Sequence, residues 1–164
     1  MGSFVVSQVK AGGGTLGICP LPGHCGTYAD DFAAVTRWAP GIVVSMTQAQ
    51  EMAGVGAGAL GEELKNAGIE WHHLPIADFG APGGAVQRAW PQVSKTISEE
   101  LGRGGRVLVH CRAGCGRSGM IVLRVMVEAG EPASDALLRL RSARACAVET
   151  PEQMKWASIP TPSG

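Results

Sequence analysis

The sequence predicts an α/β fold, in which a central, twisted and mainly parallel sheet carries helices on both faces. Short apolar, β-branched runs alternate along the chain with longer segments whose apolar residues recur at helical spacing. Such alternation is typical of strands that pair in parallel through helical crossovers. At 164 residues and 45% hydrophobic content, the chain can bury one substantial core. We therefore expect a single domain over residues 1–164, with 158–164 as a flexible tail.

The first half of the chain is predicted to hold four strands and two helices. The glycines at 12–14 separate two β-prone runs and predict a hairpin. Asp30 and Asp31 favour the N-terminus of a helix that stops before Pro40, and Gly68 closes the next helix. The expected strands are 4–9, 15–19, 42–46 and 69–75, and the expected helices are 30–38 and 60–67.

The second half is predicted to be mainly helical around one very apolar strand. Pro91 should interrupt or kink the first of its helices, whereas Pro132 and Pro151 suit helix starts. The helix that follows the strand is almost wholly apolar, so we expect it in the middle of the fold. The expected strand is 106–109, and the expected helices are 85–101, 119–129, 133–141 and 151–157.

Composition and charge narrow the class of protein. The 14 basic and 14 acidic residues give a formal net charge of zero, which argues against a nucleic-acid partner and a polybasic membrane anchor. No apolar stretch approaches the roughly 18 residues of a membrane span, and the N-terminus lacks a secretory pattern. The odd count of five cysteines argues against a secreted disulfide framework. We expect a cytoplasmic, monomeric protein with reduced thiols.

The segment from Cys111 to Ser118 has the composition of a phosphate site with a nucleophile. It follows the most apolar strand and precedes the central helix, so a helix N-terminus and successive backbone N–H groups can surround one anion. Arg117 supplies a planar guanidinium that binds two phosphoryl oxygens at once. The expected phosphate-binding residues are Arg112, Ala113, Gly114, Cys115, Gly116 and Arg117.

The same segment indicates nucleophilic catalysis. The helix N-terminus and a neighbouring guanidinium favour the thiolate form of Cys111, and Ser118 can donate a hydrogen bond to that sulfur. His110 is placed to fix the loop backbone. The leaving group needs a proton, and Asp78, on a Pro- and Gly-bounded loop after another strand, is the best donor. Asp30 and Asp31 are rival acids, but a helix start explains them adequately.

Four patches in order resemble the cysteine-dependent protein tyrosine and dual-specificity phosphatases, and the kinase-associated phosphatase group in particular. They are residues 16–23, residues 72–78 with Pro82, residues 110–118 and residues 148–153. The resemblance implies the compact dual-specificity fold and the following roles: Cys111 as nucleophile, Asp78 as general acid and then base, Arg117 as phosphate clamp, Ser118 as thiolate stabiliser and Gln153 as positioner of the hydrolytic water. Two departures from the family pattern are Cys115 and the Cys146 segment before residue 148.

Other interpretations fit the sequence less well. The spacing Gly114-x-Gly116-x-x-Gly119 matches a dinucleotide fingerprint, but no strand with a terminal acidic residue follows. Rhodanese-like and arsenate-reductase domains use similar cysteine loops but need no upstream aspartate. A zinc site has no support, because the candidate ligands lack paired spacing. These candidate ligands are Cys19, His24, Cys25, His72 and His73.

Two further features stay open at the level of sequence. Cys115 is either a packed small residue or a partner that forms a protective disulfide with Cys111 on oxidation. Arg139, Arg141 and Arg144 either contact an acidic or doubly phosphorylated substrate or lie on a solvated helix face.

We expect hydrolysis of phosphotyrosine, and possible hydrolysis of phosphoserine and phosphothreonine, through a phosphocysteine and without a metal or other cofactor. The expected partners are a phosphoprotein or phosphopeptide, with phosphate, sulfate or vanadate also binding the loop. The alternatives are a phosphoinositide or other non-protein phosphatase, and a pseudophosphatase that binds phosphoproteins without turnover.

Overall fold

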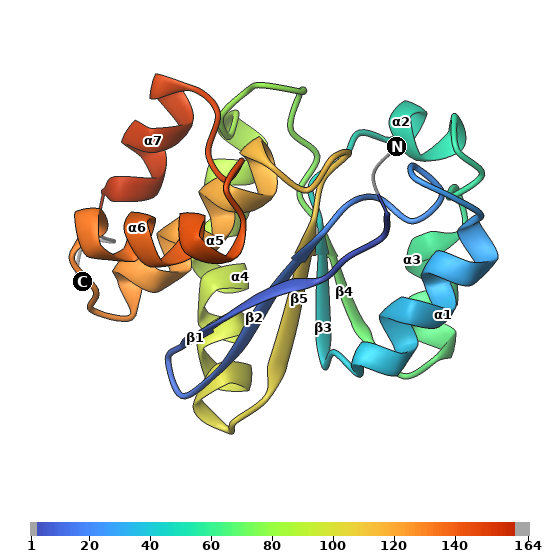
Figure 1. Cartoon of the computed structure of the whole chain (residues 1–164), viewed down its shortest axis with the longest axis horizontal. Coiled ribbons are helices and arrows are strands. Elements are labelled where there is room, and N and C mark those ends of the chain that lie inside the picture. Colours follow the sequence, from blue (N-terminus) through green and yellow to red (C-terminus); the bar gives the residue numbers. More distant parts are fainter. Residues whose placement is uncertain (1–2, 160–164) are drawn as a thin grey trace.

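The computed structural model describes residues 3–159, and its centre is a five-stranded sheet (Figure 1). The strand order is β1-β2-β5-β3-β4, and β1 (Ser7–Ala11) pairs antiparallel with β2 (Gly14–Cys19). The strands β3 (Ile42–Ser45), β4 (Glu70–His73) and β5 (Arg106–His110) are parallel to β2. The predicted α/β fold with a mainly parallel sheet is therefore confirmed.

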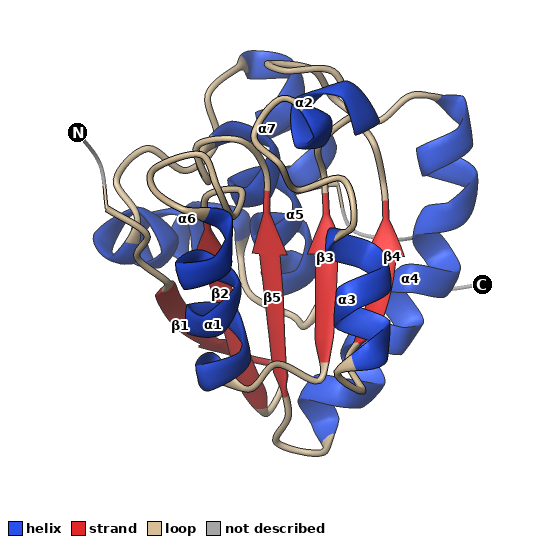
Figure 2. Cartoon of the chain, turned by 90° about the vertical axis from the view of Figure 1, so that its right-hand side faces the viewer, coloured by secondary structure: helices blue, strands red, loops and turns tan. Residues whose placement is uncertain are grey.

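Helices cover both faces of the sheet (Figures 1 and 2). One face carries α1 (Tyr28–Trp38) and α3 (Leu60–Asn66), and the short α2 (Ala49–Ala53) lies at the carboxyl end of the parallel strands. The other face carries α4 (Gly84–Gly102) and α5 (Gly116–Glu128). The last two helices pack against α5; they are α6 (Ala133–Ala143) and α7 (Pro151–Ser158).

Strand side chains alternate between two apolar cores. Val43 and Leu108 point into the core beneath α1 and α3, whereas Val44, Val107 and Val109 point into the core beneath α4 and α5. This period of two follows from the pleat, and parallel strands are apolar on both faces because helices cover both. The continuous apolar run of β5 therefore places its carboxyl end at the centre of the molecule.

Several observed elements differ from the predicted ones. The first strand, predicted at 4–9, is shifted to Ser7–Ala11. The helix α4 continues through Pro91, and α5 begins at Gly116, three residues earlier than expected. The helix α2 was not expected at all. Ser158 belongs to α7 rather than to the predicted tail, and residues 160–164 lie outside the described residues.

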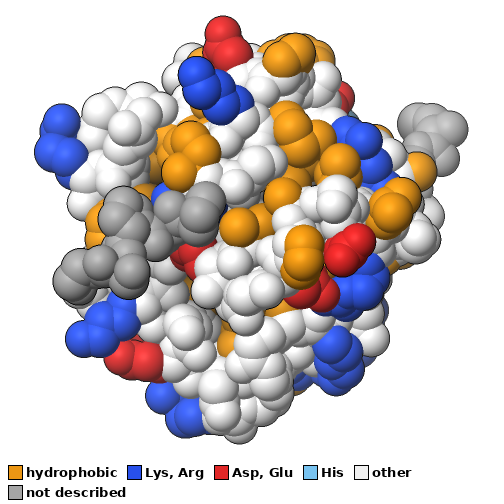
Figure 3. Space-filling view, turned by 90° about the vertical axis from the view of Figure 1, so that its left-hand side faces the viewer, with side chains coloured by type: hydrophobic (Ala, Val, Ile, Leu, Met, Phe, Trp, Pro, Cys, Tyr) orange, Lys and Arg blue, Asp and Glu red, His pale blue; other side chains and the backbone are white. Residues whose placement is uncertain are grey.

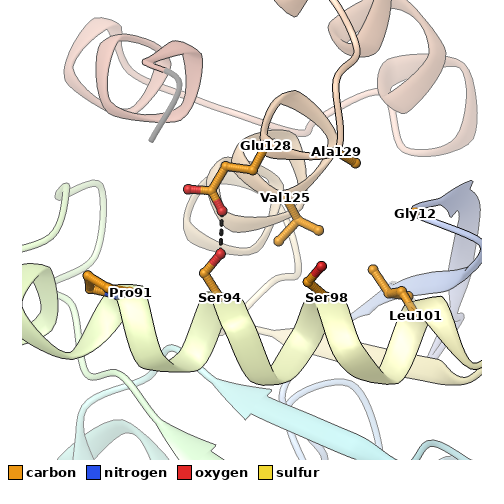
Figure 4. A pocket seen from close by; sticks show the side chains of 8 residues that line it. All are labelled: Gly12, Pro91, Ser94, Ser98, Leu101, Val125, Glu128 and Ala129. Carbon is orange, nitrogen blue, oxygen red and sulfur yellow. Dashed lines mark hydrogen bonds between the residues drawn. The ribbon is translucent and has the colours of Figure 1, made fainter. Parts of the chain in front are cut away.

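A pocket of about 270 Å³ lies between α4 and α5, next to the β1–β2 turn (Figure 4). Gly12 in this turn places the pocket at the end of the sheet opposite the carboxyl ends of the parallel strands. The carboxylate that lines the pocket is Glu128, which accepts hydrogen bonds from Ser94 (2.5 Å) and Trp90 (3.0 Å), and these bonds join α4 to α5.

Within residues 3–159, no helix is both long and apolar enough to span a membrane.

Candidate active site

The cysteine loop lies at the carboxyl end of β5, between two parallel neighbours. Residues 111–115 join β5 to α5, which places the loop at the edge of the sheet where α/β proteins bind ligands. Gly114 has φ +75°, and a Cβ atom there would lie 2.7 Å from the Cys19 backbone. Only glycine therefore fits this turn without displacement of the neighbouring strand.

The first half of the loop is held by the sheet. Met46 N donates to His110 O, and Leu21 N donates to Arg112 O, both at 3.0 Å. Between them, Nδ1 of the His110 ring lies 3.2 Å from the Cys111 carbonyl oxygen. Segments that extend β2 and β3 therefore fix the loop backbone around the thiol.

The second half of the loop is held by the segment before α7. Arg144 Nη2 donates to Ala113 O at 3.1 Å, and Arg144 Nε donates to Gly114 O at 2.9 Å. Val148 N donates to Cys115 O at 3.4 Å. Every carbonyl from residue 110 to 115 thus accepts a hydrogen bond, and the loop amides and the free N–H groups of the first turn of α5 remain for an anion.

His110 is buried and neutral. The Cys111 carbonyl can only accept, so His110 Nδ1 carries the ring proton and donates to it. Nε2 of the neutral ring then accepts from the Ser45 hydroxyl, 2.5 Å away, and Ser45 Oγ accepts from Trp71 Nε1 at 2.8 Å. Burial lowers the pKa of His110 to about 4. The ring therefore acts on the loop as a fixed donor and carries no charge near neutral pH.

Arg117 is buried in the first turn of α5 and faces three acceptors. Both terminal nitrogens donate to the Glu51 carboxylate at 2.8 Å, and Nη1 also donates to Ile76 O. Burial alone would lower the pKa of Arg117, but the Glu51 hydrogen bonds and nearby negative charges raise it. The Arg117 hydrogen bonds likewise lower the pKa of Glu51. Arg117 Nε has no partner among the described residues, which leaves that edge for an anion.

Asp78 lies over the cysteine loop, although 34 residues separate it from Arg112. Its carboxylate lies 2.9 Å from Arg112 Nη2 and 3.2 Å from Arg117 Nη2. The next residue, Phe79, has φ +63° and a ring that is 58% exposed. The β4–α4 loop thus brings one carboxyl group and one aromatic ring to the rim of the site.

Ser118 and Cys111 are both buried. Cys111 is buried and carries a free thiol. Ser118 Oγ is buried, and no residue within 3–159 forms a hydrogen bond with it. A buried hydroxyl without a partner costs free energy, so this position suits a donor that is used only when charge develops nearby.

Gln153 joins the site through its side-chain amide. Its Oε1 accepts from the backbone N–H groups of Glu149 (2.9 Å) and Thr150 (3.2 Å), and the latter bond completes a capping box at α7. Its Nε2 donates to Gly80 O at 3.0 Å, on the Asp78 loop. Gln153 is therefore a structural link as it stands, and water positioning stays a prediction.

Cys115 does not pair with Cys111. It forms a disulfide with Cys146, with the two Cα atoms 5.1 Å apart. Both sequence-based interpretations of Cys115 are therefore wrong for this structure, as is the expectation that all thiols are reduced. The reason is topological: Cys115 ends the loop on its outer side, where the segment before α7 passes, whereas Cys111 lies on the inner side.

The three arginines near the end of α6 make hydrogen bonds within the fold, and Arg139 and Arg141 are exposed on that helix, as the solvated-face interpretation expects. Contact with a substrate stays a prediction. Arg139 pairs with Glu131 and donates to Lys10 O. Arg141 donates to the carbonyls of residues 147 and 148, and Arg144 to those of the cysteine loop. Figure 3 views the molecule from the side of α6 and α7, where basic and acidic side chains are dispersed among neutral ones.

The glycines that imitate a dinucleotide fingerprint have a different explanation. A Cβ on Gly114 would lie 2.6 Å from Arg144 Nη2, and one on Gly119 would lie 2.6 Å from Val148 N. A Cβ on Gly116 would collide with the Glu149 side chain. These three positions therefore require glycine because residues 144–149 pass close to the loop and to the first turn of α5.

Comparison with known proteins agrees with this geometry. Residues 42–158 match the model of the dual specificity phosphatase, catalytic domain. This chain belongs to the dual-specificity phosphatase family. A curated relative, the probable protein tyrosine phosphatase type IVA A of Dictyostelium discoideum, is 32% identical over 88 residues, which are 51% of this chain and 49% of the relative.

Solved structures extend the likeness over nearly the whole chain. The active form of Tk-PTP has a TM-score of 0.72 and 30% identity over 92% of both chains. Kinase associated phosphatase has a TM-score of 0.82 over 96% of this chain and 93% of its own, and its 21% identity supports the fold alone. The family prediction is thus confirmed. The chain spans about half the length of the curated relatives that it matches.

Within this phosphatase fold, two residues at the site were not identified from the sequence. Glu51 holds Arg117, and its only sequence signal is the capping-box pair with Gln48, which the structure forms. The helix α2 has only five residues, so its sequence is too short to show a helical period. Phe79 has no sequence signal beyond its place beside Asp78, because its backbone conformation depends on the loop.

Proposed function

We propose that this phosphatase-family protein hydrolyses phosphotyrosine in proteins, and also phosphoserine and phosphothreonine, through a phosphocysteine intermediate. The observation that carries the proposal is the position of Asp78, within 3.2 Å of the buried Arg117 and above the Cys111 loop. A phosphate-binding loop without a proton donor would bind a phosphate group but would not assist the departure of the leaving group. A carboxyl group at the mouth of that loop supplies the proton that a departing alkoxide or phenoxide requires.

In the first step, the Cys111 thiolate attacks phosphorus while the bond to the ester oxygen breaks. Arg117 and the loop N–H groups bind the three non-bridging oxygens, and Asp78 gives its proton to the leaving oxygen. The products are a free alcohol or phenol and a phosphocysteine. Because the carbonyls of residues 110–115 are already held from outside, the amides need no reorganisation during this charge transfer.

In the second step, water attacks the phosphocysteine and Asp78, now a carboxylate, takes a proton from that water. The sulfur leaves as a thiolate, and we assign its stabilisation to the unpaired hydroxyl of Ser118. Gln153, beside Gly80 of the Asp78 loop, is our candidate for orienting the water. Phosphate is released and the enzyme returns to its starting state.

The exposed ring of Phe79 favours an aryl phosphate as the main substrate. A phenyl group on the ester oxygen would emerge beside Asp78, where a ring that is 58% exposed offers a flat apolar surface. We also propose that the protein works as a monomer in the cytoplasm, where a reduced Cys111 can act as nucleophile. Cell fractionation and light scattering test these two points.

Steady-state hydrolysis of aryl phosphates with good and poor leaving groups tests the mechanism. Cys111→Ser should abolish turnover, and Asp78→Asn should lower kcat/KM, which reports the first step, by about 100-fold or more for the poorest leaving group, with a smaller loss for p-nitrophenyl phosphate. Asp30→Asn, which changes an exposed aspartate on α1, is the matched control. Turnover by Cys111→Ser, or equal losses in Asp78→Asn for all leaving groups, would contradict the mechanism.

A further inference from the structure

The disulfide joins the phosphate loop to a segment outside it. Cys115 immediately precedes α5, and Cys146 lies between α6 and α7. Cys146 is exposed and Cys115 is half-buried, so a reductant in solution can reach the bond. Cys111 is buried and is not part of it.

Arg144 binds the same part of the loop. Its Nε and Nη2 atoms donate to Gly114 O and Ala113 O at 2.9 and 3.1 Å. Its Nη1 atom donates to Val5 O and Ser7 Oγ at 3.1 and 3.2 Å. One planar guanidinium therefore fixes the middle of the loop to the N-terminal strand, a geometry that a lysine ammonium cannot reproduce.

We propose that residues 144–148, which we name the outer brace, orient the amides of the phosphate loop, and that the Cys115–Cys146 disulfide makes this function sensitive to thiol redox state. Arg144 is the positioning residue of the brace. The inference rests on the proposed function, because it assigns a role in phosphate binding to residues that do not touch phosphate.

Peptide geometry explains how an outer contact reaches an inner anion. The C=O and N–H groups of one peptide unit point in opposite directions, because the unit is planar and trans. Fixing the carbonyls of Ala113 and Gly114 toward Arg144 therefore directs the following N–H groups into the loop. Without the brace, these peptide planes can rotate, and some of the loop N–H groups then no longer donate hydrogen bonds to the anion.

The redox step is a thiol–disulfide exchange with a dithiol reductant. A thiolate of the reductant attacks one sulfur of Cys115–Cys146 and displaces the other cysteine as a thiolate. The second thiol of the reductant then attacks the reductant's own sulfur in the mixed disulfide and displaces the first cysteine. Two electrons and two protons pass to the protein, which gains two thiols, while the dithiol becomes a disulfide. Disulfides that form inside cells are usually transient and redox-sensing, which agrees with an exposed bond beside an active site.

The test measures tungstate binding by titration calorimetry in a Cys111→Ser background, so that neither turnover nor oxidation of the nucleophile contributes. We expect the oxidised protein to bind tungstate about tenfold more tightly than the dithiothreitol-reduced protein, the scale of one or two hydrogen bonds. The added Cys146→Ser change should give the weaker affinity under both conditions.

Arg144 is tested in the same oxidised background. Arg144→Gln should weaken tungstate binding by about ten- to 100-fold, and Arg144→Lys should recover part of the loss. Ser7→Ala, which removes one partner of Nη1 and leaves the loop contacts, is the matched control and should bind normally. In the Cys111 enzyme, Arg144→Gln should raise KM more than it lowers kcat, whereas a loss of folded protein would lower only the apparent kcat.

Equal tungstate affinity in oxidised, reduced and Cys146→Ser proteins would overturn the redox part, and normal binding by Arg144→Gln would overturn the positioning role. Absence of tungstate binding in every form would instead contradict the proposed function, and with it the inference. The brace and the phosphatase mechanism therefore fail in different ways.

Discussion

The two halves of the phosphate loop are held by different means. Backbone N–H groups after β2 and β3, together with the buried ring of His110, hold residues 110–112. A guanidinium, one long backbone hydrogen bond and a disulfide hold residues 113–115 from a connection outside the sheet. The first half is thus part of the core of the fold, whereas the second half depends on partners that can change without unfolding the sheet.

This difference separates stability from function. Loss of a contact on the sheet side exposes or unpairs a buried group, which costs free energy of folding and activity together. Loss of a side-chain contact on the outer side frees a few peptide units near the surface, and it should reduce anion binding first. Four substitutions or conditions probe this separation.

The largest effect is expected for Glu51→Gln on the sheet side. The change leaves the buried Arg117 without the carboxylate that accepts from both of its terminal nitrogens, and breaking such a pair typically costs about 3–5 kcal/mol. Denaturant unfolding in phosphate-free buffer at neutral pH measures this loss in the free energy of unfolding, and Glu62→Gln on the surface of α3 is the control. A loss no larger than that of the control would show that Arg117 does not depend on Glu51.

The next effect is a pH dependence of stability that comes from His110. The unfolded histidine titrates near 6.5 and the folded one near 4, so the unfolded state binds more protons in between. The contribution is present above pH 6.5 and is lost as pH falls to 4, by about 3 kcal/mol in total. Denaturant unfolding at several pH values in this range should show that the free energy of unfolding falls more steeply with decreasing pH for the wild type than for His110→Gln.

Below about pH 4.5 the lowered pKa of Glu51 adds a second loss, since the unfolded state then binds a proton that the folded carboxylate does not. The His110 comparison is therefore made above pH 4.5, where the difference between the two proteins belongs to the histidine. Parallel curves for wild type and His110→Gln would contradict a buried, neutral ring.

Gly114→Ala acts where the two halves meet. Its Cβ would press on the Cys19 backbone and the Arg144 guanidinium, at a φ that disfavours alanine. We expect about a 100-fold loss of kcat/KM from the displaced amides. Gly58→Ala, where a Cβ meets open space, should match the wild type. Equal activity of the two variants would show that the loop tolerates displacement.

The smallest effect is expected for Arg112→Ala at the rim. Arg112 is half-exposed and its direct ion pair with Asp78 is open to solvent, and such pairs contribute about 1 kcal/mol or less. The change should alter kcat only a few-fold and leave thermal stability unchanged. A loss as large as that of Asp78→Asn would mean that the Arg112 contact is needed to hold Asp78 in its reactive position.

Much of this arrangement follows from the sequence, because strong local patterns specify it. The apolar strand, the glycines and the serine around Cys111 predict a strand–loop–helix unit, and the structure forms one. Asp78 is found because it follows another parallel strand, and such strand ends meet at one edge of the sheet.

The remaining features depend on contacts between distant segments. Glu51 reaches Arg117 from a five-residue helix whose sequence is too short to show a period. Cys115 and Cys146 each depart from the family pattern, and the structure gives both departures one explanation, since they form a single disulfide. No spacing rule predicts that pairing, because α5 and α6 lie between the two cysteines and their packing brings the cysteines together.

The central claim is that Cys111 carries the phosphoryl group between the two steps. Rapid acid quench of the enzyme during turnover of an aryl phosphate, followed by peptide mass spectrometry, tests it most directly. A phosphoryl group on Cys111 that appears in the wild type, accumulates in a variant slowed in the second step such as Gln153→Ala, and is absent in Cys111→Ser is the predicted result. Turnover without any phosphocysteine would contradict the account.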